Sequence, residues 1–528
     1  LVVRNFPRIG HHADSFVDQF PRRHTTRFPR RTRINSGRLT MDFDLESADI
    51  ATIARALSDR VLSSVELTEA YISRIEQLDP HINAVLHHNP TVLETAQQSD
   101  HDRTKGLVRG PLHGIPIMIK DNLDTGDSMP TTAGSLALKD HYQSNDADVV
   151  RNLRDAGVVL LGKTNLSEWA NFRSTRSSSG WSSLGGQTRN PYALDRSPGG
   201  SSSGSGAAVA ASLCAGAIGT ETDGSIVGPS AMNGLVGIKP TVGLVSTQGI
   251  IPISSSQDTA GPITKTVTDA AIILGAITSS SQSATSADYT PYLNPAGLKH
   301  KRIGSWRSFL VETDGVATVF DDAISVIRSA GAEVVELNTL PSQHAVRENE
   351  MTVMSAEFKH GLNAYLSALP PYFPNNLTEL IAFNRERSRE VMAYFQQELL
   401  ERSDSSCSIY DQEYRSARSK SIQLVRTNGM DPHLSQKKLD AILVPTTSTP
   451  WKIDLVNGDN RNGSSAYLAA VSGYPSITVP AGHVHGLPVG VSFITRPWQE
   501  PVLIEIAYAF ELLTQARRPP NFKMTIQT

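Results

Sequence analysis

Two clusters of serine and glycine stand close together in the sequence and are the first candidates for chemistry. They are Ser197–Gly206 (SPGGSSSGSG) and Gly219–Ser230 (GTETDGSIVGPS), and they flank the segment AAVAASLCAGAI. Runs of this composition are usually flexible linkers. Glycine, however, also lets backbone N–H groups come close to a substrate oxygen. The enclosed segment is small, apolar and compatible with a helix, which is expected of a buried element rather than of a linker.

Ser225 lies at the end of the stretch TETDGS. Consecutive backbone N–H groups in such a stretch can point at one position, as an oxyanion hole requires, and the serine would be the nucleophile. No histidine suggests itself as its base, but a lysine in a dry pocket can lose its proton and serve instead. Lys120 ends the apolar stretch IPIMIK, so it is the lysine most expected to be desolvated. Taken alone, these residue types are more often structural or solvated.

The elements that would position these residues alternate between strands and helices. A capping box, Ser63 with Glu66, starts a helix that we expect to end before Pro80. Further strands are expected at 82–88, 114–122, 158–165, 439–446 and 474–494, and further helices at 146–157, 320–331 and 501–515. Continuously apolar strands separated by helices indicate an α/β fold. We predict one large α/β/α domain whose mixed, mostly parallel central sheet has helices on both faces.

Composition excludes several classes of protein. The chain has 528 residues, of which 39% are hydrophobic and 19% charged, and its net charge of −3 gives no general attraction to nucleic acid or membrane. Two cysteines allow no disulfide framework. No run of about 18 apolar residues is present, so no membrane span is expected.

The first forty residues differ from the rest of the chain. They carry nine Arg, no Lys and two Asp, a net charge of +7. Such a segment is typical of a mitochondrial presequence, but its three prolines would break the amphipathic helix that a presequence needs. We expect residues 1–40 to be a disordered basic segment outside a domain of residues 41–528, which opens at Met41.

Two short motifs match known patterns without the structural context they need. Residues 157–164 (GVVLLGKT) fit the P-loop pattern, but Val158–Leu161 would be a strand rather than a phosphate-binding turn. Residues 200–204 fit the G-x-S-x-G elbow of α/β-hydrolases, centred on Ser202, yet the preceding PYALDRSPG is polar and contains proline. An α/β-hydrolase esterase is therefore a minor alternative.

Several longer motifs agree with one family. GIPIMIKDNLDT, GKTNLSEWANF, GGQTRNPY, SPGGSSSGS, GTETDGSIVGPSAMNGLVGIKPTVGLVS, GIIPISSSQDTAGPI and GYPSITVP occur in the order and spacing of the amidase signature family. The similarity covers roughly Leu45 to the C-terminus and is weak between about 275 and 435. The wording of GTETDGSI and SGWSSLGGQTRNP most resembles the peptide amidase branch. The resemblance implies a signature core at about 110–270 and a variable substrate-pocket region at about 275–435.

The resemblance also implies roles for individual residues. It makes Ser225 the nucleophile, Ser201 the bridging serine that follows a cis peptide bond, and Lys120 the base. The 24-residue gap between Ser201 and Ser225 matches the family's spacing. By the same resemblance the oxyanion hole and the substrate contacts would be Thr222, Asp223, Gly224, the N–H of Ser225 and, within the pocket loop 173–179, Thr175. Asp223 replaces a common glycine of the turn, and because Asp tolerates positive φ better than most residues, we expect the turn to survive without much strain. Val227 replaces a common arginine, so we expect a less charged wall beside the nucleophile.

The expected function is hydrolysis of a carboxamide, most simply a primary amide, to carboxylate and ammonia through an acyl-enzyme. The substrate would be a small-molecule or peptide amide, with no metal, no organic cofactor and no nucleic acid involved. Within the family, the alternative is a component like the A subunit of an amidotransferase, working in a tRNA-dependent complex. We expect a cytoplasmic protein, or a mitochondrial one if residues 1–40 are a presequence, and leave a homodimer open.

Overall fold

One long sheet runs through the part of the chain that the computed structural model describes. That part comprises residues 43–278, 287–307, 315–338, 340–460 and 463–526, with the backbone of β1 (Ile34–Ser36) and β2 (Leu39–Met41). The eleven strands that the described residues contribute to the sheet are, in spatial order, β12 (Glu333–Glu336), β11 (Arg302–Ser305), β13 (Ala441–Pro445), β15 (Leu487–Ile494), β14 (Ser476–Val484), β9 (Val236–Lys239), β10 (Thr259–Thr264), β8 (Gly216–Glu221), β4 (Pro116–Lys120), β5 (Val159–Thr164) and β3 (Val85–His88).

The sheet is mixed, as the sequence predicts, but its parallel pairing is confined to two stretches. β12, β11 and β13 are parallel neighbours, and so are β8, β4 and β5. The other neighbouring pairs are antiparallel. The centre departs from the mostly parallel arrangement because β14 and β15 form a hairpin, and a hairpin reverses the chain where a helical crossover would not.

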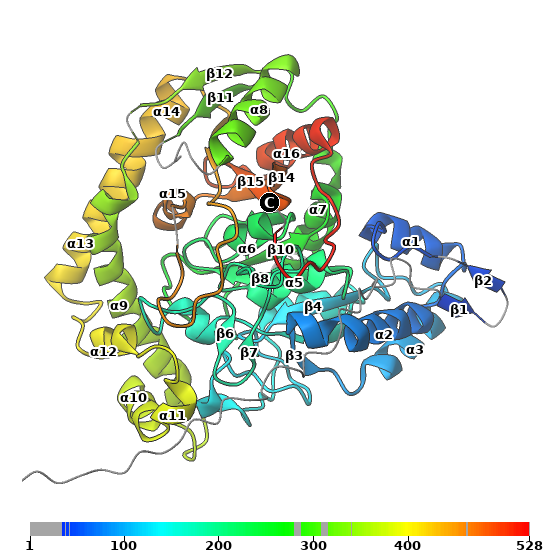
Figure 1. Ribbon diagram of the computed structural model, residues 1–528, viewed down its shortest axis with the longest axis horizontal. Helices are drawn as coiled ribbons and strands as arrows, with labels where there is room; N and C mark the ends of the chain where they lie inside the picture. The colour runs from blue at the N-terminus through cyan, green and yellow to red at the C-terminus, as the bar shows by residue number, and fades with distance from the viewer. Residues whose placement is uncertain are drawn as a thin grey trace, which may run out of the picture.

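Helices cover both faces of this sheet (Figure 1). A side chain at Gly216 would meet Ile273 of α7 (Val267–Ile277), whereas one at Gly219 would meet Ser202, which precedes α5 (Ser203–Ala210). Residues three apart on a strand point to opposite faces. One face of the sheet is therefore covered by α7, and the other by the segment that carries the first serine-glycine cluster.

That cluster is part of the core and not a linker. α5 begins inside it and continues into the apolar segment, which then turns and enters β8. A Cβ atom at Gly204 would lie 2.3 Å from the carbonyl oxygen of Ala84 and 2.5 Å from that of Asn165. Glycine is therefore required for α5 to pack this closely against its neighbours.

The helices predicted from the sequence are present, with one difference at Pro80. They are α2 (Ser64–Ile82), α4 (Asp148–Asp155), α8 (Val316–Ser329) and α16 (Glu500–Thr514). The expectation that α2 ends before Pro80 is wrong, because the helix continues to Ile82. A proline in the last turn removes only one backbone donor. Asp79 compensates by accepting the N–H groups of Asn83 through its carbonyl oxygen and of Ala84 through its carboxylate.

The region from about 340 to 435 forms an arm of helices beside the sheet. It contains α9 (Gln343–Ser367), α10 (Leu377–Glu386), α11 (Ser388–Val391), α12 (Glu398–Asp404), α13 (Gln412–Ile422), the π-helical segment η4 (Gln423–Met430) and α14 (Asp431–Gln436). In Figure 1, α9 and α13 lie side by side at the left, facing α15 (Ala466–Ser472).

At the opposite side of the view lie α1 (Ile50–Ser58), α2 and α3 (Val92–Thr104) (Figure 1). None of the helices in the described ranges is long and apolar enough to cross a membrane. Most of the basic segment 1–40 lies outside the described residues, so its expected disorder stays a prediction. The boundaries of the signature core and of the variable region stay predictions as well.

Candidate active site

The structure brings two of the predicted catalytic side chains into direct contact. The Nζ atom of Lys120 lies 2.8 Å from the Oγ atom of Ser201. Lys120 is the last residue of β4, and Ser201 follows a cis peptide bond to Gly200. Both side chains are completely buried. This contact forms at the carboxyl ends of the parallel strands β4 and β8, where sites in α/β sheets are commonly found.

Thr220 of β8 completes the surroundings of the lysine. Its carbonyl oxygen lies 3.2 Å from Lys120 Nζ and its Oγ1 atom 2.8 Å from it. The Nδ2 atom of Asn122 also donates to Thr220 Oγ1, at 3.0 Å. A hydroxyl oxygen has two lone pairs, so Lys120 and Asn122 together occupy both of them. With two N–H groups directed at Thr220, a neutral lysine would have its lone pair left for the hydroxyl of Ser201.

Burial makes the neutral form of this lysine accessible. It lowers the pKa of Lys120 from 10.5 to about 7, with the carboxylates of Asp258 and Glu221 acting in the opposite direction. A lysine with this pKa is substantially unprotonated near neutral pH, whereas an ordinary lysine is not. The site therefore holds an amine that can act as a base.

Ser225 is placed beside Ser201 through their backbones. The N–H of Ser202 donates to the carbonyl oxygen of Ser225 at 3.3 Å. Ser225 keeps 8% of its surface exposed while Ser201 has none, so Ser225 is the more accessible of the two serines. This is the arrangement expected of an outer nucleophile and an inner bridging residue.

Glu221 holds the loop that carries Ser225. Its carboxylate accepts the N–H groups of Ile226 and Val227, at 2.7 and 2.9 Å, in front of α6 (Val227–Met232). Burial raises the pKa of Glu221, and contacts with these N–H groups and with that of Gly224 act against the rise. The carboxylate thus satisfies helix-terminal donors that would otherwise be unpaired in the core.

The turn in this loop depends on Gly224 rather than on Asp223. Gly224 has φ +84°, and a Cβ atom there would lie 3.0 Å from Cβ of Ala466 in α15. Asp223, whose substitution for glycine raised the question of strain, does not adopt positive φ. Its carboxylate instead lies near Glu350 of α9. Burial is the main cause that raises the pKa of Glu350, and the negative charge of Asp223 is the second.

The loop Ser254–Asp258, which precedes β10, braces Thr222. The hydroxyl of Thr222 donates to Asp258 Oδ1 at 2.6 Å, and its carbonyl oxygen accepts from Gln257 Nε2 at 3.3 Å. Gln257 also donates to Glu350 Oε1 at 3.0 Å.

Sequence reasoning missed Thr220, Glu221, Asp258 and Glu350. The only signal for the first two was their place in the second serine-glycine cluster, and Glu350 lies in the weakly patterned arm.

The expected pocket loop 173–179 lies partly against Gly200, the residue before Ser201. Ser179 Oγ would be 3.0 Å from a Cβ atom at Gly200. Thr175 is exposed, and its N–H and hydroxyl both donate to Glu398 of α12 at 2.8 Å. Ser179 is thus the end of the loop next to the site, and a substrate contact by Thr175 stays a prediction.

The two short motifs that match other protein classes form ordinary secondary structure in this protein. Residues 159–164 of the P-loop match form strand β5, as expected. The G-x-S-x-G match leads directly into α5 and follows no strand. Within the described residues, no three His, Cys, Asp or Glu side chains are grouped in a way that could hold a metal ion.

A buried lysine contacts a buried serine at the carboxyl ends of parallel strands, and a second serine lies on an adjacent glycine-rich loop, which is an arrangement suited to a serine hydrolase that uses lysine as its base. The family model named Amidase matches residues 66–504, and the chain belongs to the amidase family. It is an amidase with the mixed sheet and covering helices of the amidase signature fold.

The native peptide amidase of Stenotrophomonas maltophilia is similar in structure. It is 48% identical, with a TM-score of 0.86, over 90% of this chain and 99% of that one. A probable amidase of Arabidopsis thaliana is 38% identical over 92% of this chain and 93% of its own length. The A subunit of a glutamyl-tRNA(Gln) amidotransferase of Thermoanaerobacter pseudethanolicus is 34% identical over 90% of this chain and 99% of its own length.

Proposed function

We propose that this amidase hydrolyses C-terminal primary amides of peptides through an acyl-enzyme on Ser225. The observation that carries the mechanism is the 2.8 Å contact between Lys120 Nζ and Ser201 Oγ, fully buried, with the pKa of the lysine lowered to about 7. The peptide class is supported by the 48% identity to peptide amidase.

In the first step Ser225 Oγ attacks the amide carbon. Its proton passes to Ser201 Oγ as the proton of Ser201 passes to neutral Lys120, so the lysine becomes an ammonium ion. Backbone N–H groups of the loop Thr222–Ser225 stabilise the negative oxygen of the tetrahedral intermediate. The relay then returns the proton to the nitrogen, the C–N bond breaks, and ammonia leaves.

Water completes the reaction by the same route. It gives a proton to the relay as it attacks the ester carbonyl of the acylated Ser225, and the relay returns that proton to Ser225 Oγ when the carboxylic acid leaves. Lys120 thus ends the cycle neutral, as it began. The released acid then loses its remaining proton to the solvent and becomes the carboxylate.

A role within an amidotransferase complex is the second candidate. It is supported by the 34% identity to the A subunit of a glutamyl-tRNA(Gln) amidotransferase over almost the whole of that protein. The higher identity to peptide amidase favours an enzyme that works alone. The homodimer and the compartment expected from the sequence stay predictions.

The deciding experiment measures ammonia released from amidated peptides by the purified chain, without ATP or tRNA. We expect turnover with peptide amides, none with Ser225→Ala, and competitive inhibition by chymostatin, which the peptide amidase PAM binds as a competitive inhibitor. Ammonia release from glutamine that required partner proteins and tRNA would favour the second candidate and overturn the first.

A further inference from the structure

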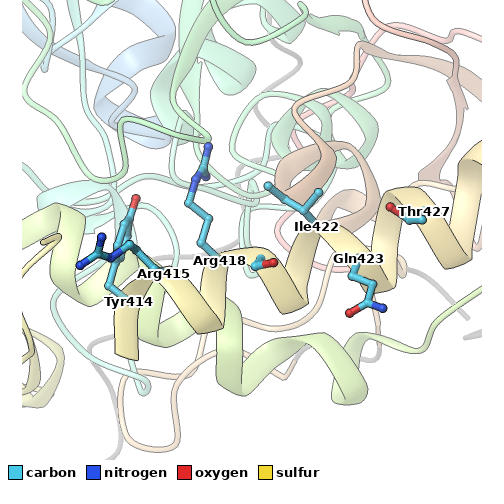
Figure 2. Close-up of a pocket in the computed structure, with 7 residues that line it drawn as sticks. Tyr414, Arg415, Arg418, Ile422, Gln423 and Thr427 are labelled. Carbon is cyan, nitrogen blue, oxygen red and sulfur yellow. The ribbon is translucent and has the colours of Figure 1, made fainter. Parts of the chain in front are cut away.

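A cleft of about 650 Å³ follows one face of α13 and its continuation η4. The residues that line it belong to α13 and η4, so it is an open groove along this helical segment. Tyr414, Arg418 and Ile422 line it at intervals of four residues, which places them on one side of the helix. Figure 2 shows Arg418 extending from its helix toward the ribbons of the catalytic core. A π-helical segment such as η4 is itself frequent at functional sites.

Hydrogen bonds join this cleft to the loop that braces Thr222. The hydroxyl of Tyr414 donates to Glu357 Oε1 at 2.5 Å, and Glu357 Oε2 accepts the hydroxyl of Ser254 and the N–H of Ser256 at 2.5 and 3.0 Å. The same loop contacts Thr222 through Asp258. Tyr414 in the wall of the cleft is therefore connected, through Glu357, to the loop that braces Thr222.

The helical segment that lines the cleft also packs near the loop that carries Ser225. α13 and η4 pack beside α15, and Arg426 Nε donates to the carbonyl oxygen of Ser472 at 2.6 Å. The first residue of α15, Ala466, is the one that touches Gly224. A substrate with its amide at Ser225 would thus extend past α15 toward α13.

Arg418 is the charged group of this cleft that is not already used. Both oxygens of Glu357 are occupied by Tyr414, Ser254 and Ser256, and Arg415 donates to the carbonyl oxygen of Tyr410. In the part of the chain that the structure describes, Arg418 makes no hydrogen bond or ion pair, although it is half-buried. A guanidinium in a partly desolvated cleft is suited to bind a carboxylate with two hydrogen bonds.

We propose that Arg418 binds an acidic side chain of the substrate, so that this enzyme prefers peptide amides carrying Asp or Glu upstream of the amidated residue. The inference rests on the proposed function, because it assigns a substrate class to the same site. Such a contact stabilises a substrate by a charge-assisted hydrogen bond, which corresponds to a preference of about tenfold in kcat/KM.

The test uses N-acetylated peptide amides with Glu, Gln or Lys at each of the three residues before the amidated one. For the wild-type chain we expect Glu to exceed Gln by about tenfold in kcat/KM at one position, and Lys to fall below Gln. Arg418→Gln should bring the ratio of Glu to Gln near one, and Arg418→Glu should reverse the order in favour of Lys. Lys420→Gln is the matched control, since it removes the same charge from an exposed position on the same helix outside the cleft, and it should keep the wild-type ratio.

The outcomes separate the two proposals. Hydrolysis of the Gln peptides without a preference for Glu at any position would overturn the inference alone, as would a preference that survives in Arg418→Gln and Arg418→Glu. If the wild-type chain hydrolyses none of the peptides, the proposed function falls and the inference with it. Melting temperatures of the Arg418 variants show whether a lost preference reflects lost folding.

Discussion

The carboxylate of Glu221 accepts the backbone N–H of Ile226 at 2.7 Å, across the turn that contains Ser225. A buried acidic side chain therefore helps to fix the loop that carries Ser225, the proposed nucleophile. The geometry of an oxyanion hole depends on a few tenths of an ångström, so this support should be visible in the rate.

Glu221→Leu should lower both stability and rate. The substitution removes Oε2, the oxygen that accepts the N–H groups of both Ile226 and Val227, and it leaves these buried donors unpaired at a cost of about 1–3 kcal/mol. Displacement of the loop should reduce kcat by about 10- to 100-fold. Denaturant unfolding and steady-state kinetics measure the two effects, and a normal kcat in a destabilised variant would show that the loop keeps its shape without the carboxylate.

The three predicted catalytic residues should behave as one unit. Ser225→Ala, Ser201→Ala and Lys120→Ala should each reduce kcat strongly, on the order of 10⁴-fold for Ser225→Ala, and the triple variant should lose little more than the worst single one. A serine-directed phosphonate should add its mass to the wild-type chain and not to Ser225→Ala. Labelling of Ser202 instead would contradict this assignment and support the α/β-hydrolase alternative.

The pKa of Lys120 should set the acidic limb of the pH–rate profile. The value of about 7 predicts that kcat/KM falls below about pH 7 as the amine is protonated. An inflection that lies below about pH 5 would contradict this assignment, because the lysine would then be neutral throughout the usual range.

The same pKa has a consequence for stability. Because the folded value lies below the unfolded one, the unfolded chain binds more protons between about pH 7 and 10.5, so this group favours folding increasingly as pH rises through that window. Below the folded pKa its cost is constant, at roughly 5 kcal/mol from a shift of this size. Lys120→Met should therefore unfold at a higher temperature than the wild type near pH 7, and the difference should shrink toward about pH 10.

Gly224→Ala tests the turn before the nucleophile. At φ +84°, with a new Cβ atom 3.0 Å from Ala466, the substitution should cost about 1–2 kcal/mol and lower kcat. Gly224→Ala with Ala466→Gly removes the contact but not the backbone strain, so it should recover only part of the loss. Gly228→Ala is the control, since its Cβ atom would have one neighbour, at 3.9 Å.

Deleting residues 1–40 should leave melting temperature and turnover unchanged. The buried Leu45 lies at the start of the described core, and the turn around it is held by Lys265, whose Nζ donates to the carbonyl oxygens of Leu45 and Ala48. A deletion that continues through Asp49 would remove these acceptors and leave the buried amine of Lys265 without hydrogen-bond partners there. It should destabilise the protein by more than about 2 kcal/mol. Equal effects of the two deletions would show that the basic segment docks on the domain.

The sequence could predict those residues of the candidate site that stand in a recognisable short pattern, such as an apolar strand or a glycine-rich stretch. Lys120 was predictable because an apolar strand that ends in a charge signals burial, and Ser225 because glycine-rich stretches offer backbone donors. Thr220 could not be predicted, since its double role depends on the pairing of β4 with β8. Glu350 and Glu357 reach the loop from more than 90 residues away, and no local signal encodes such contacts.

The fold shows the same division. Strands and helices with a strong apolar pattern were predicted within a few residues, whereas the antiparallel centre of the sheet depends on which strands become neighbours. Pro80 shows that a rule about helix ends can yield to tertiary context, here to the hydrogen bonds of Asp79.

The close packing of α5 also affects how this protein can vary. Because a methyl group at Gly204 would collide with two carbonyl oxygens, and one at Gly206 would lie 2.9 Å from Asn233 Nδ2, substitutions here should be rejected as firmly as substitutions of Ser225. A saturation-mutagenesis map would then mark the whole serine-glycine stretch as essential, although Ser201 alone within it is proposed to handle a proton. In this enzyme, a position around the active site can be intolerant of substitution because there is no room for a larger side chain, and not only because its side chain reacts. An assay that measures the amount of folded protein separately from its turnover number distinguishes the two causes.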